Sequence, residues 1–503
     1  MTLRSFSLFD LYANNAAQTP HAPAALWPGG RQTFEQLADD AHALSLGLAE
    51  YGLRPGDRVA VLAKNTSHFL NLFGAASLLG CVLVLVNRRL STEEITTIIE
   101  DTTPRLLVAG EEFQDLAAQL EQNHAFLEKS CIIGSRDHLG LPYLYFYHDK
   151  APTPRTTGTD PFVIIHTAAV HGRPRGAVLS EHNLLLASLQ LAFSLSLNRS
   201  DCYLNLLPLF HIMGMNLALA VMLAGGANVI QEQFDPEQAR KLITAHNVTL
   251  LGTFPPMLNN LLEALRSNPE PPKYLRNVIG LEQPEIVQAW EKETGSRFWT
   301  MYGQTETSGL ITFSPYDART GAAGRPGQLT NMKIVDEFDR LLPVGQTGEI
   351  VVRGPLVFQG YWQQDELNEH TFREGWHHTG DLGLVDQEGY LFFKGRKAEK
   401  DLIKSGGENV FPVEVEKVIL EHPGVDEVCV IGVPDPKFGE GIKAICVQAG
   451  RSPLTKEELI AYVGSKIAPY KKPRYVDFVD ALPRTEAGDI DRAAVKEQFT
   501  PEA

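Results

Sequence analysis

A segment with glycine and arginine follows one of the most apolar stretches of the sequence. Residues 161–166 (PFVIIH) predict a buried strand, and residues 166–183 (HTAAVHGRPRGAVLSEHN) then open a leucine-rich stretch that predicts a helix. A turn between a strand and a helix presents backbone N–H groups that can hold phosphate, and Arg173 and Arg175 would add positive charge. An ordinary strand-to-helix turn would look much the same, so this segment alone does not decide the chemistry.

Further short segments carry polar, aromatic and glycine residues in a fixed order along the chain. They are YGQTE (302–306), GD (380–381), GR (395–396) and SGGENVFP (405–412). Four longer ones accompany them: VNRRLS (86–91), LPLFHIMGMN (207–216), GEIVVRGPLVFQGYW (348–362) and LPRTEAGDIDR (482–492). Each segment is short, but the order and spacing of the set are specific.

With these segments, the chain resembles the adenylate-forming superfamily of acyl-CoA synthetases, peptide-synthetase adenylation domains and luciferases over almost its whole length. The resemblance implies an α/β fold: a large N-terminal domain of doubly wound βαβ subdomains with a small antiparallel β subdomain, and a mobile α+β C-terminal domain. It also implies that a small-molecule carboxylic acid is activated as acyl-AMP and transferred to coenzyme A. The expected cofactors are ATP or AMP, Mg²⁺ and coenzyme A.

The resemblance assigns the chemistry of adenylation to residues 302–306. Thr305 would contact the α-phosphate, and Glu306 would hold the magnesium that neutralises charge as the carboxylate oxygen attacks that phosphate. Tyr302 would stack on adenine, with Gly303 and Gln304 beside it. Considered without the resemblance, Glu306 could be an acid at a helix cap and Tyr302 a core aromatic.

Two more residues are expected at the nucleotide. Asp381 would accept hydrogen bonds from both ribose hydroxyls, and Arg396 would reach the same sugar from the domain boundary. A buried Asp–Arg pair with a purely structural purpose is the alternative.

The resemblance also predicts residues on the thiol side. His211 would line the acyl site, although a lone histidine among apolar residues is often simply packed. Glycines in SGGEN would let the backbone approach the pantetheine arm, because they lack β-carbons, and a simple tight turn is the alternative. The residues expected at the cofactors here are Lys400, Lys404, Gly406, Gly407 and Glu408.

The phosphate loop departs from the family pattern. The family loop is rich in serine, threonine and glycine and carries a lysine before its last glycine, whereas residues 167–176 read TAAVHGRPRG. Arg175 keeps the positive charge, in a fork suited to phosphate oxygens, but hydroxyl contacts are lost. The residues expected to hold phosphate are Thr167, Gly172, Arg173, Arg175 and Gly176.

A second departure concerns the catalytic lysine of the family, which follows a glycine near the C-terminus. This chain has Gly488 and Asp489 there, and a carboxylate would oppose the adenylation transition state. Three accounts stay open: adenylation is intrinsically slow, the enzyme works mainly in reverse from acyl-CoA toward ATP, or another cation replaces the lysine. The candidate cations are Lys394, Lys400, Lys404 and Arg492.

The leading hypothesis is an AMP-forming acyl-CoA ligase. An enzyme that loads a carrier-protein thiol and a non-catalytic AMP or acyl-CoA binding protein are the alternatives, the latter because of Asp489 and the altered loop. The acyl pocket is expected near His211 to Met215, Thr253 to Pro256, Trp299 and Thr307, and Trp299 and Met301 could shorten it. Short, medium or aromatic acids are therefore favoured over very long fatty acids.

Behind these residues, apolar strands alternate with helices, which predicts a parallel sheet covered on both faces. Strands are expected at 58–63, 81–86, 105–110, 161–166 and 248–253, and helices from Thr33 to Gly52, near 67–79 and near 91–101. Residues 325–394 predict short antiparallel strands. A separate α+β unit would contain a helix at 412–422, strands at 427–432 and 443–448, and a helix after the capping box Thr455 to Glu458.

The expected domains are residues 1–395 for adenylation and 396–503 for thioester formation, with a hinge between Lys397 and Asp401. The apolar stretch Met213 to Ile230 is interrupted by Asn216, Gly225, Gly226 and Asn228, so it predicts a buried core helix rather than a membrane span.

Composition narrows the classes of partner. A formal charge of -16 and a pI near 5.4 disfavour nucleic acid or an anionic membrane. Five scattered cysteines suggest neither disulfides nor a zinc site, which fits a cytoplasmic protein. No signal pattern opens the chain, and a monomer or homodimer is expected.

Overall fold

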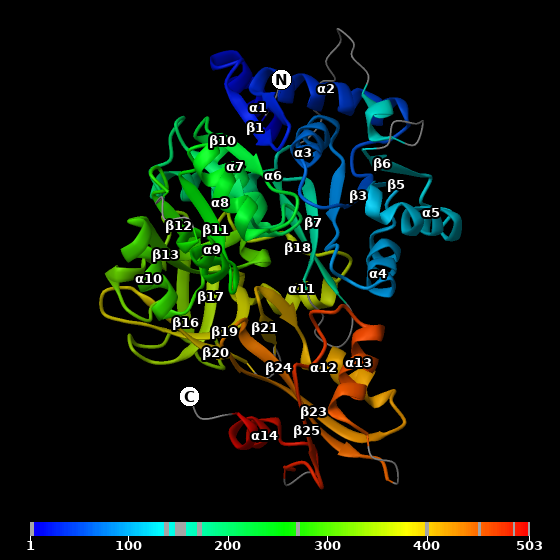
Figure 1. Cartoon of the computed structure of the whole chain (residues 1–503), viewed down its shortest axis with the longest axis vertical. Helices are drawn as coiled ribbons and strands as arrows, with labels where there is room; N and C mark the ends of the chain where they lie inside the picture. The colour runs from blue at the N-terminus through cyan, green and yellow to red at the C-terminus, as the bar shows by residue number, and fades with distance from the viewer. Residues whose placement is uncertain are drawn as a thin grey trace.

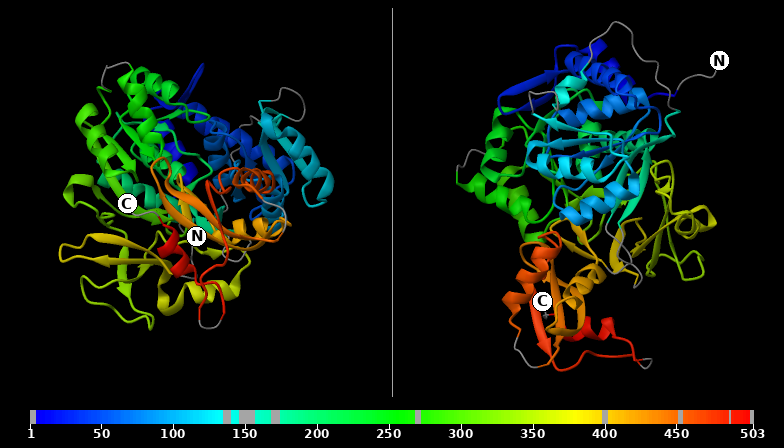
Figure 2. Two further views of the ribbon diagram at one scale, coloured as in Figure 1. Left: turned by 60° about the horizontal axis from the view of Figure 1, so that its bottom comes forward. Right: turned by 90° about the vertical axis from the view of Figure 1, so that its right-hand side faces the viewer.

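The computed structural model describes residues 5–134, 140–145, 157–167, 174–267, 272–397, 402–450, 454–485 and 488–500. Figure 1 shows a large unit that begins at the N-terminus and a smaller unit, coloured orange to red, against one end of it. The views in Figure 2 agree on this arrangement. We call residues up to 397 the large domain and residues from 402 the small domain.

One sheet of the large domain is mainly parallel. Its order is β18 (Gly360–Tyr361), β8 (Arg175–Ser180), β7 (Pro161–Thr167), β4 (Val82–Leu85), β3 (Arg58–Leu62), β5 (Leu106–Gly110) and β6 (Lys129–Ile133). The strands from β7 to β6 are parallel, whereas β8 and β18 are antiparallel at one edge.

Helices cover both faces of this sheet, as predicted. Val59 and Val61 pack into one core while Ala60 and Leu62 pack into another, because successive side chains of a strand point to opposite faces. The first core is shared with α1 (Leu8–Gln18), α2 (Phe34–Glu50) and α3 (His68–Leu79), and the second with α4 (Thr92–Thr102) and α5 (Gln114–Asn123). The capping box predicted at Thr33 and Gln36 is confirmed at the start of α2.

A second sheet carries the middle of the chain. Its order is β15 (Arg325–Pro326), β14 (Gly309–Pro315), β13 (Arg297–Gln304), β12 (Asn277–Gly280), β11 (Leu250–Thr253), β9 (Cys202–Asn205), β10 (Ala227–Ile230), β1 (Pro23–Trp27) and β2 (Gly30–Thr33). Its helices are α6 (Glu181–Ser194), α7 (Ile212–Leu223), α8 (Pro236–Ala245), α9 (Met257–Arg266) and α10 (Pro284–Thr294). Buried residues of α6 and α7 share one core with residues of both sheets.

The prediction of a single helix from Met213 to Ile230 is wrong. Helix α7 ends at Leu223, and Ala227–Ile230 forms strand β10, which pairs with β9 and β1. Gly225 adopts a φ of +76°, and a Cβ on Gly226 would lie 2.3 Å from the carbonyl oxygen of Asp201. The two glycines therefore turn the chain and let it approach β9 closely. Because the whole stretch is apolar, its sequence did not show that a helix is followed by a strand.

The antiparallel subdomain predicted between residues 325 and 394 is present. Its sheet contains β16 (Asn331–Val335), β17 (Gly348–Arg353), β19 (His377–Val385) and β20 (Leu391–Arg396), and α11 (Asp365–Thr371) precedes β19. The boundary placed at residues 395 and 396 stays a prediction; Arg396 is the last residue of β20 and pairs with Asp381 of β19.

The small domain is a separate α+β unit with its own core. Its sheet contains β22 (Glu408–Val410), β21 (Ile403–Ser405), β24 (Gly439–Gln448), β23 (Val425–Asp435) and β25 (Tyr475–Val479), and its helices are α12 (Pro412–Leu420), α13 (Lys456–Lys466) and α14 (Arg492–Phe499). The capping box of Thr455 and Glu458 is confirmed. Among the described residues, no helix is long and apolar enough to span a membrane.

Candidate functional site

A cavity of about 930 Å³ lies where the antiparallel subdomain, the second sheet and the small domain meet. Residues from the segment at 167–176, from the segment at 302–306 and from the GD and GR segments line it. The predicted site residues that line it are Thr167, Arg175, Tyr302, Gly303, Gln304, Thr305, Glu306, Asp381, Arg396 and Lys404. We call it the nucleotide cavity, and the individual roles of its residues stay predictions.

Residues 302–306 reach the nucleotide cavity because they end β13. This strand pairs with antiparallel β14, and the chain turns between them through a short 3-10 helix, Thr305–Thr307. Gln304 caps this turn, since its backbone N–H donates to the Thr307 hydroxyl (3.0 Å). Thr305 and Glu306 are therefore fixed on a rigid turn, with only 9% and 7% of their surface exposed.

The carboxylate of Glu306 is held by hydroxyl groups. Tyr361 Oη donates to Glu306 Oε1 at 2.9 Å, and Thr167 Oγ1 donates to the same oxygen at 3.4 Å. No described residue donates a hydrogen bond to Oε2. A buried carboxylate with one oxygen left for a ligand suits a hard cation such as Mg²⁺.

Asp381 forms the centre of a second polar group. It accepts from Tyr302 Oη at 2.7 Å and from the amide of Gln304, and Arg396 Nε lies 4.0 Å from its Oδ1. Burial, and then the carboxylate of Asp381, raise the pKa of Tyr302 well above its usual range, so the hydroxyl remains a donor. The Tyr302 ring lies 5.9 Å from the Phe393 ring.

The expected strand-to-helix turn of the phosphate loop is wrong. Residues after Thr167 lead into β8, which pairs antiparallel with β7, and α6 begins only at Glu181 with Ser180 as its N-cap. The element that comes directly before α6 is therefore a strand, β8. The reason is residues 176–180 (GAVLS), which form a strand between β7 and β18 before the helix starts.

Within this loop, Gly172 and Arg173 lie outside the described residues. Gly176 lies in β8, where a Cβ would come within 2.7 Å of Ile164, and its carbonyl accepts from Trp362 N–H at 2.8 Å. The observed contacts of Gly176 are thus packing contacts between strands.

A second cavity, of about 450 Å³, is lined by residues of both the large and the small domain. His211, Gly406, Gly407 and Glu408 line it. The two glycines adopt φ angles of +60° and +85°, and Cβ atoms on them would come within 3.0 Å of Phe438 and 3.1 Å of Phe254. Both glycines are therefore required by backbone conformation and by space. We call this the thiol-side cavity.

His211 lies at the N-cap of α7, at the wall of the thiol-side cavity. Burial lowers the pKa of His211 below its usual value, and Glu408 only partly opposes this. The imidazole is therefore neutral at physiological pH.

A group of basic and aromatic residues here was not predicted from the sequence. Arg88, Arg89 and Arg474 line the thiol-side cavity, and the guanidinium of Arg474 lies 3.5 Å from the centre of the Phe438 ring. Arg89 also pairs with Glu408 at 2.5 Å. The adjacent arginines in VNRRLS and the basic segment KKPR (471–474) were the available signals.

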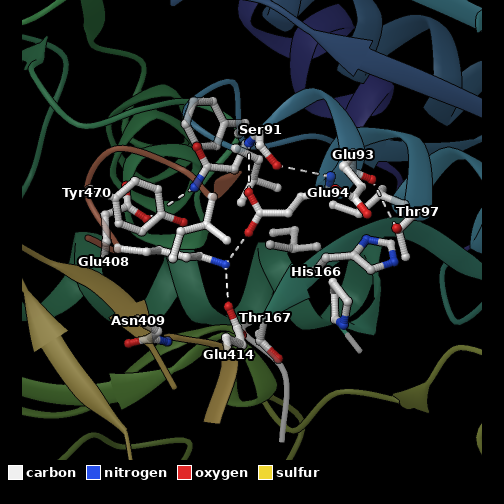
Figure 3. Close-up of a pocket in the computed structure, with 18 of the residues that line it drawn as sticks. Ser91, Glu93, Glu94, Thr97, His166, Thr167, Glu408, Asn409, Glu414 and Tyr470 are labelled. Carbon is white, nitrogen blue, oxygen red and sulfur yellow. Dashed lines mark hydrogen bonds and ion pairs between the residues drawn. The ribbon is translucent and has the colours of Figure 1, made fainter. Parts of the chain in front are cut away.

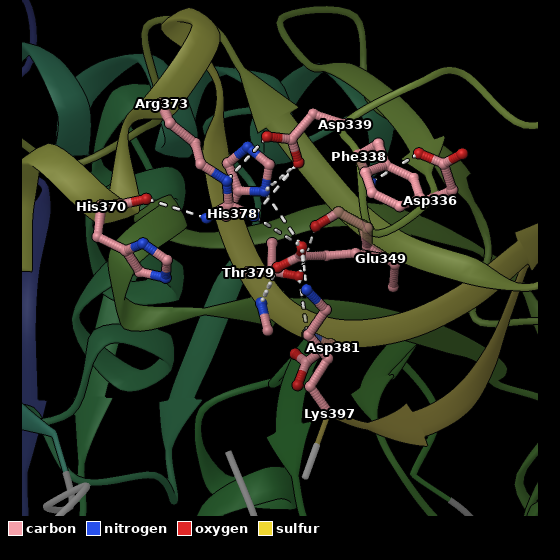
Figure 4. Close-up of polar contacts among 12 residues, drawn as sticks. Asp336, Phe338, Asp339, Glu349, His370, Arg373, His378, Thr379, Asp381 and Lys397 are labelled. Carbon is pink, nitrogen blue, oxygen red and sulfur yellow. Dashed lines mark hydrogen bonds and ion pairs between the residues drawn. The ribbon is translucent and has the colours of Figure 1, made fainter. Parts of the chain in front are cut away.

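Residues at the domain connection are anchored to the large domain (Figure 4). Lys397 Nζ contacts Glu349 at 2.8 Å, and Glu349 is also held by His378 (3.1 Å) and Arg373 (3.3 Å). Because Lys397 and Arg373 already neutralise it, the group of Asp339, Glu349 and His378 does not suit a metal ion. The other residues of the predicted hinge, 398–401 with Lys400, lie outside the described residues.

An interdomain cavity of about 400 Å³ joins the two others (Figure 3). It shares Thr167 and Thr305 with the nucleotide cavity, and His211 and Glu408 with the thiol-side cavity. On one wall, Lys471 of the small domain pairs with Glu414 at 2.5 Å and with Glu94 of α4. Glu94 also accepts from Ser91 N–H at 2.7 Å in the capping box of α4.

Asp489 and Trp299, which were also discussed for the site, line none of these three cavities. Asp489 is exposed, and the segment between β25 and α14 that contains it lies at the end of the small domain farthest from the large domain (Figures 1 and 2). Trp299, expected at the acyl pocket, lines a different cavity with Tyr390, and its indole N–H donates to Asn277.

Comparisons with known proteins agree with this arrangement. Residues 12–362 match the family of AMP-binding enzymes, and residues 414–489 match the AMP-binding enzyme C-terminal domain. The chain is 31% identical to a feruloyl-CoA synthase of Amycolatopsis, covering 99% of this chain and 100% of that protein. It is 30% identical to a 2-succinylbenzoate–CoA ligase of Bacillus cereus, covering 95% and 96% of the two chains.

Solved structures show the same likeness. An o-succinylbenzoate-CoA synthetase of Bacillus subtilis matches with a TM-score of 0.85 at 27% identity, over 98% of this chain and 99% of that one. An amide bond synthetase of Marinactinospora thermotolerans matches with a TM-score of 0.87 at 28% identity, over 97% and 100%. Together with the meeting of the three cavities, these matches establish that the chain belongs to the family of AMP-binding enzymes, as an acid–thiol ligase of the AMP-forming acyl-CoA synthetase type.

Proposed function

We propose that this protein activates an aromatic carboxylic acid with ATP and magnesium in the cytoplasm and transfers the acyl group to coenzyme A. One observation carries the proposal: the interdomain cavity links a nucleotide cavity at Thr305 with a basic thiol-side cavity at His211 and Glu408. A nucleotide and a phosphorylated thiol could thus reach the same acyl group from opposite sides. All five cysteines lie among the described residues, where they are buried and form no disulfide, which fits a reducing compartment.

In the first half-reaction, Asp381 receives the ribose hydroxyls, while Thr305 and Arg175 meet the phosphate oxygens. An oxygen of the substrate carboxylate attacks the α-phosphorus, and the bond to the β-phosphate breaks, so that pyrophosphate leaves with the electron pair. The family motif and the Oε2 atom of Glu306, to which no described residue donates, support this carboxylate as the magnesium ligand. Magnesium bound there would neutralise charge on the phosphates.

In the second half-reaction, the thiolate of coenzyme A attacks the acyl carbonyl and AMP leaves. Gly406 and Gly407 leave room for the narrow pantetheine arm, and Arg88, Arg89 and Arg474 offer charge to its anionic end. The neutral imidazole of His211 lies where the thiol would arrive and can accept its proton.

The domain orientation fits this second half-reaction. Glu408 and the two glycines face the centre, whereas the segment that contains Asp489 is remote. Adenylation would then need a rotation about residues 397–401, which brings position 489 to the phosphates. A carboxylate there would slow adenylation in both directions, because forward and reverse reactions pass through one transition state, so Asp489 gives no preference for the reverse direction.

The acid is proposed to be aromatic because two similar proteins are a feruloyl-CoA synthase and a 2-succinylbenzoate–CoA ligase. Apolar side chains next to the catalytic centre support a flat apolar substrate, since Phe210 lines the interdomain cavity and Leu281 and Met301 line the nucleotide cavity.

The test is to incubate the protein with ATP, Mg²⁺, coenzyme A and a panel of aromatic, short and fatty acids, and to detect acyl-CoA and AMP by mass spectrometry. The expected result is one aromatic acyl-CoA with matching AMP. A fatty acyl-CoA alone would contradict the substrate class. Acyl transfer only to a holo-carrier protein would replace coenzyme A as the acceptor, and binding of AMP or acyl-CoA without turnover would identify a non-catalytic relative.

The Glu306→Gln variant tests the assignment of Glu306 as the magnesium ligand. It should lower adenylation at least about a hundredfold, as is typical when a group that stabilises transition-state charge is removed. Thioester formation from synthetic acyl-AMP should continue, because that step does not use the β- and γ-phosphates. Full adenylation by Glu306→Gln would refute the magnesium assignment.

A further inference from the structure

Tyr361 stands between the two charged groups of the phosphate end of the nucleotide cavity. Its hydroxyl donates to Glu306 Oε1 at 2.9 Å, and the guanidinium carbon of Arg175 lies 5.6 Å from the centre of its ring. Arg175 and Glu306 line the same cavity, yet no ion pair joins them in the described part of the chain. Tyr361 therefore contacts both the cation and the carboxylate, while these two form no ion pair with each other among the described residues.

The backbone holds Tyr361 firmly. Strand β18 pairs with β8, with Tyr361 opposite Ala177. Tyr361 N–H donates to the side chain of Asn368 at 2.7 Å, and the Asn368 amide donates back to the Tyr361 carbonyl at 3.0 Å. The ring packs edge-on against Phe358 at 4.9 Å. The ring position is thus set by the sheet edge and by α11.

The same segment also holds Glu306. The backbone N–H of Phe358 donates to the Glu306 carbonyl at 2.9 Å, three residues before Tyr361. Backbone and carboxylate of Glu306 are therefore fixed by one short stretch, residues 358–361.

We propose that Tyr361 is a positioning residue that keeps Glu306 available to a divalent cation and Arg175 available to phosphate. Its hydroxyl fixes one carboxylate oxygen and leaves Oε2 to the cation. Its ring prevents Arg175 from closing onto Glu306 in an ion pair, which would cancel both charges before the nucleotide binds. The inference rests on the proposed function, because it assumes that this cavity binds Mg²⁺ with ATP.

Two substitutions separate the two parts of this role. Tyr361→Phe keeps the ring and removes the hydroxyl, so the half-saturating Mg²⁺ concentration for adenylation should rise about tenfold, as for a lost hydrogen bond to a charged group. Tyr361→Leu also removes the aromatic ring. Arg175 can then form an ion pair with Glu306, so the KM for ATP should rise as well. In both variants, thioester formation from synthetic acyl-AMP should keep its wild-type rate.

Metal binding without turnover gives an independent readout. Mn²⁺ binding in the presence of a non-hydrolysable ATP analogue, followed by electron paramagnetic resonance, should weaken about tenfold in Tyr361→Phe. This measurement needs no catalysis, so it stays informative even if the proposed ligase reaction is not found. Absence of Mn²⁺ binding by the wild-type protein would overturn the inference.

Tyr390→Phe is the matched control. Tyr390 is buried, and the guanidinium of Arg325 lies 4.2 Å from its ring centre, so this is another arginine–tyrosine contact, and Tyr390 lines a cavity other than the nucleotide cavity. This variant should keep the wild-type Mg²⁺ requirement. If Tyr361→Phe fails to fold, Thr167→Val removes the other donor to Oε1 and must raise the Mg²⁺ requirement in the same direction. An unchanged requirement in a folded Tyr361→Phe protein would overturn the inference.

Discussion

Lys471 of the small domain forms an ion pair with Glu94 of the large domain, and a second one with Glu414 of its own domain. Only 5% of Lys471 is exposed. Burial alone would lower its pKa, but the two carboxylates outweigh burial and raise it, so the ammonium stays charged. This buried contact favours the observed orientation of the domains.

Lys471→Met should therefore impair the thioester step. The substitution leaves two carboxylates facing each other across the interface, and loss of one partner of a buried ion pair costs about 3–5 kcal/mol. Even 1.4 kcal/mol corresponds to about tenfold in a conformational equilibrium. Single-turnover formation of acyl-CoA from synthetic acyl-AMP should fall at least about tenfold, while adenylation is retained. Lys472→Met, at the exposed neighbouring position, is the control, and an equal loss in both half-reactions would contradict the interpretation.

Asp489→Lys should raise the rate of adenylation by about tenfold or more, since a cation replaces a carboxylate at the transition state. Stability should not change, because the residue is exposed in this orientation. Pyrophosphate exchange into ATP measures the rate. Asp489→Ala separates removal of the negative charge from gain of a positive one, and wild-type rates in both variants would show that another residue already supplies the charge.

Gly407→Ala should raise the KM for coenzyme A several-fold and leave adenylation unchanged. The new methyl group would lie 3.1 Å from Phe254 at a φ of +85°, so the thiol-side cavity must distort. Initial rates against coenzyme A concentration test this expectation. Gly450→Ala has a similar φ of +73° in open space and controls for backbone strain; equal effects of the two substitutions would argue against a role in thiol access.

Glu349 should stabilise the folded protein at neutral pH, and this contribution should be lost in acid. Burial would raise the pKa of Glu349, but hydrogen bonds from His378 and Lys397 outweigh it and lower the pKa to about 2. The contribution of the carboxylate is complete above its unfolded pKa of about 4.3 and is lost as pH falls toward 2. The difference in melting temperature between wild type and Glu349→Gln should therefore be largest near pH 7 and shrink below pH 4.3. Glu366→Gln, at an exposed site, should show no such trend.

The fold was predictable where one physical signal dominated. Val59 to Leu62 are apolar on both faces, and the Thr33 and Gln36 pair marks a helix start by local hydrogen bonds. The stretch from Met213 to Ile230 failed because burial on all sides removes the periodicity that separates a helix from a strand. Only Gly225 and Gly226 marked the turn between the two elements.

The site was predictable as a set of segments but not as a geometry. Thr305, Glu306 and Asp381 meet in one cavity, as the order of motifs implied. Tyr361 and Lys471 were missed because their partners, Glu306 and Glu94, are 55 and 377 residues away in the sequence. Such contacts are set by sheet order and by domain docking, which short-range patterns do not encode.

The two oxygens of Glu94 serve different parts of the molecule. Oε2 caps the first turn of α4 through Ser91 N–H, while Oε1 receives Lys471 from the small domain. When the small domain rotates away, the Glu94 carboxylate loses its ion pair with Lys471. The hydrogen bond from Ser91 N–H to Glu94 is then held less firmly. The amide proton of Ser91 would then exchange faster with solvent, so α4 contains a native spectroscopic reporter of the catalytic cycle.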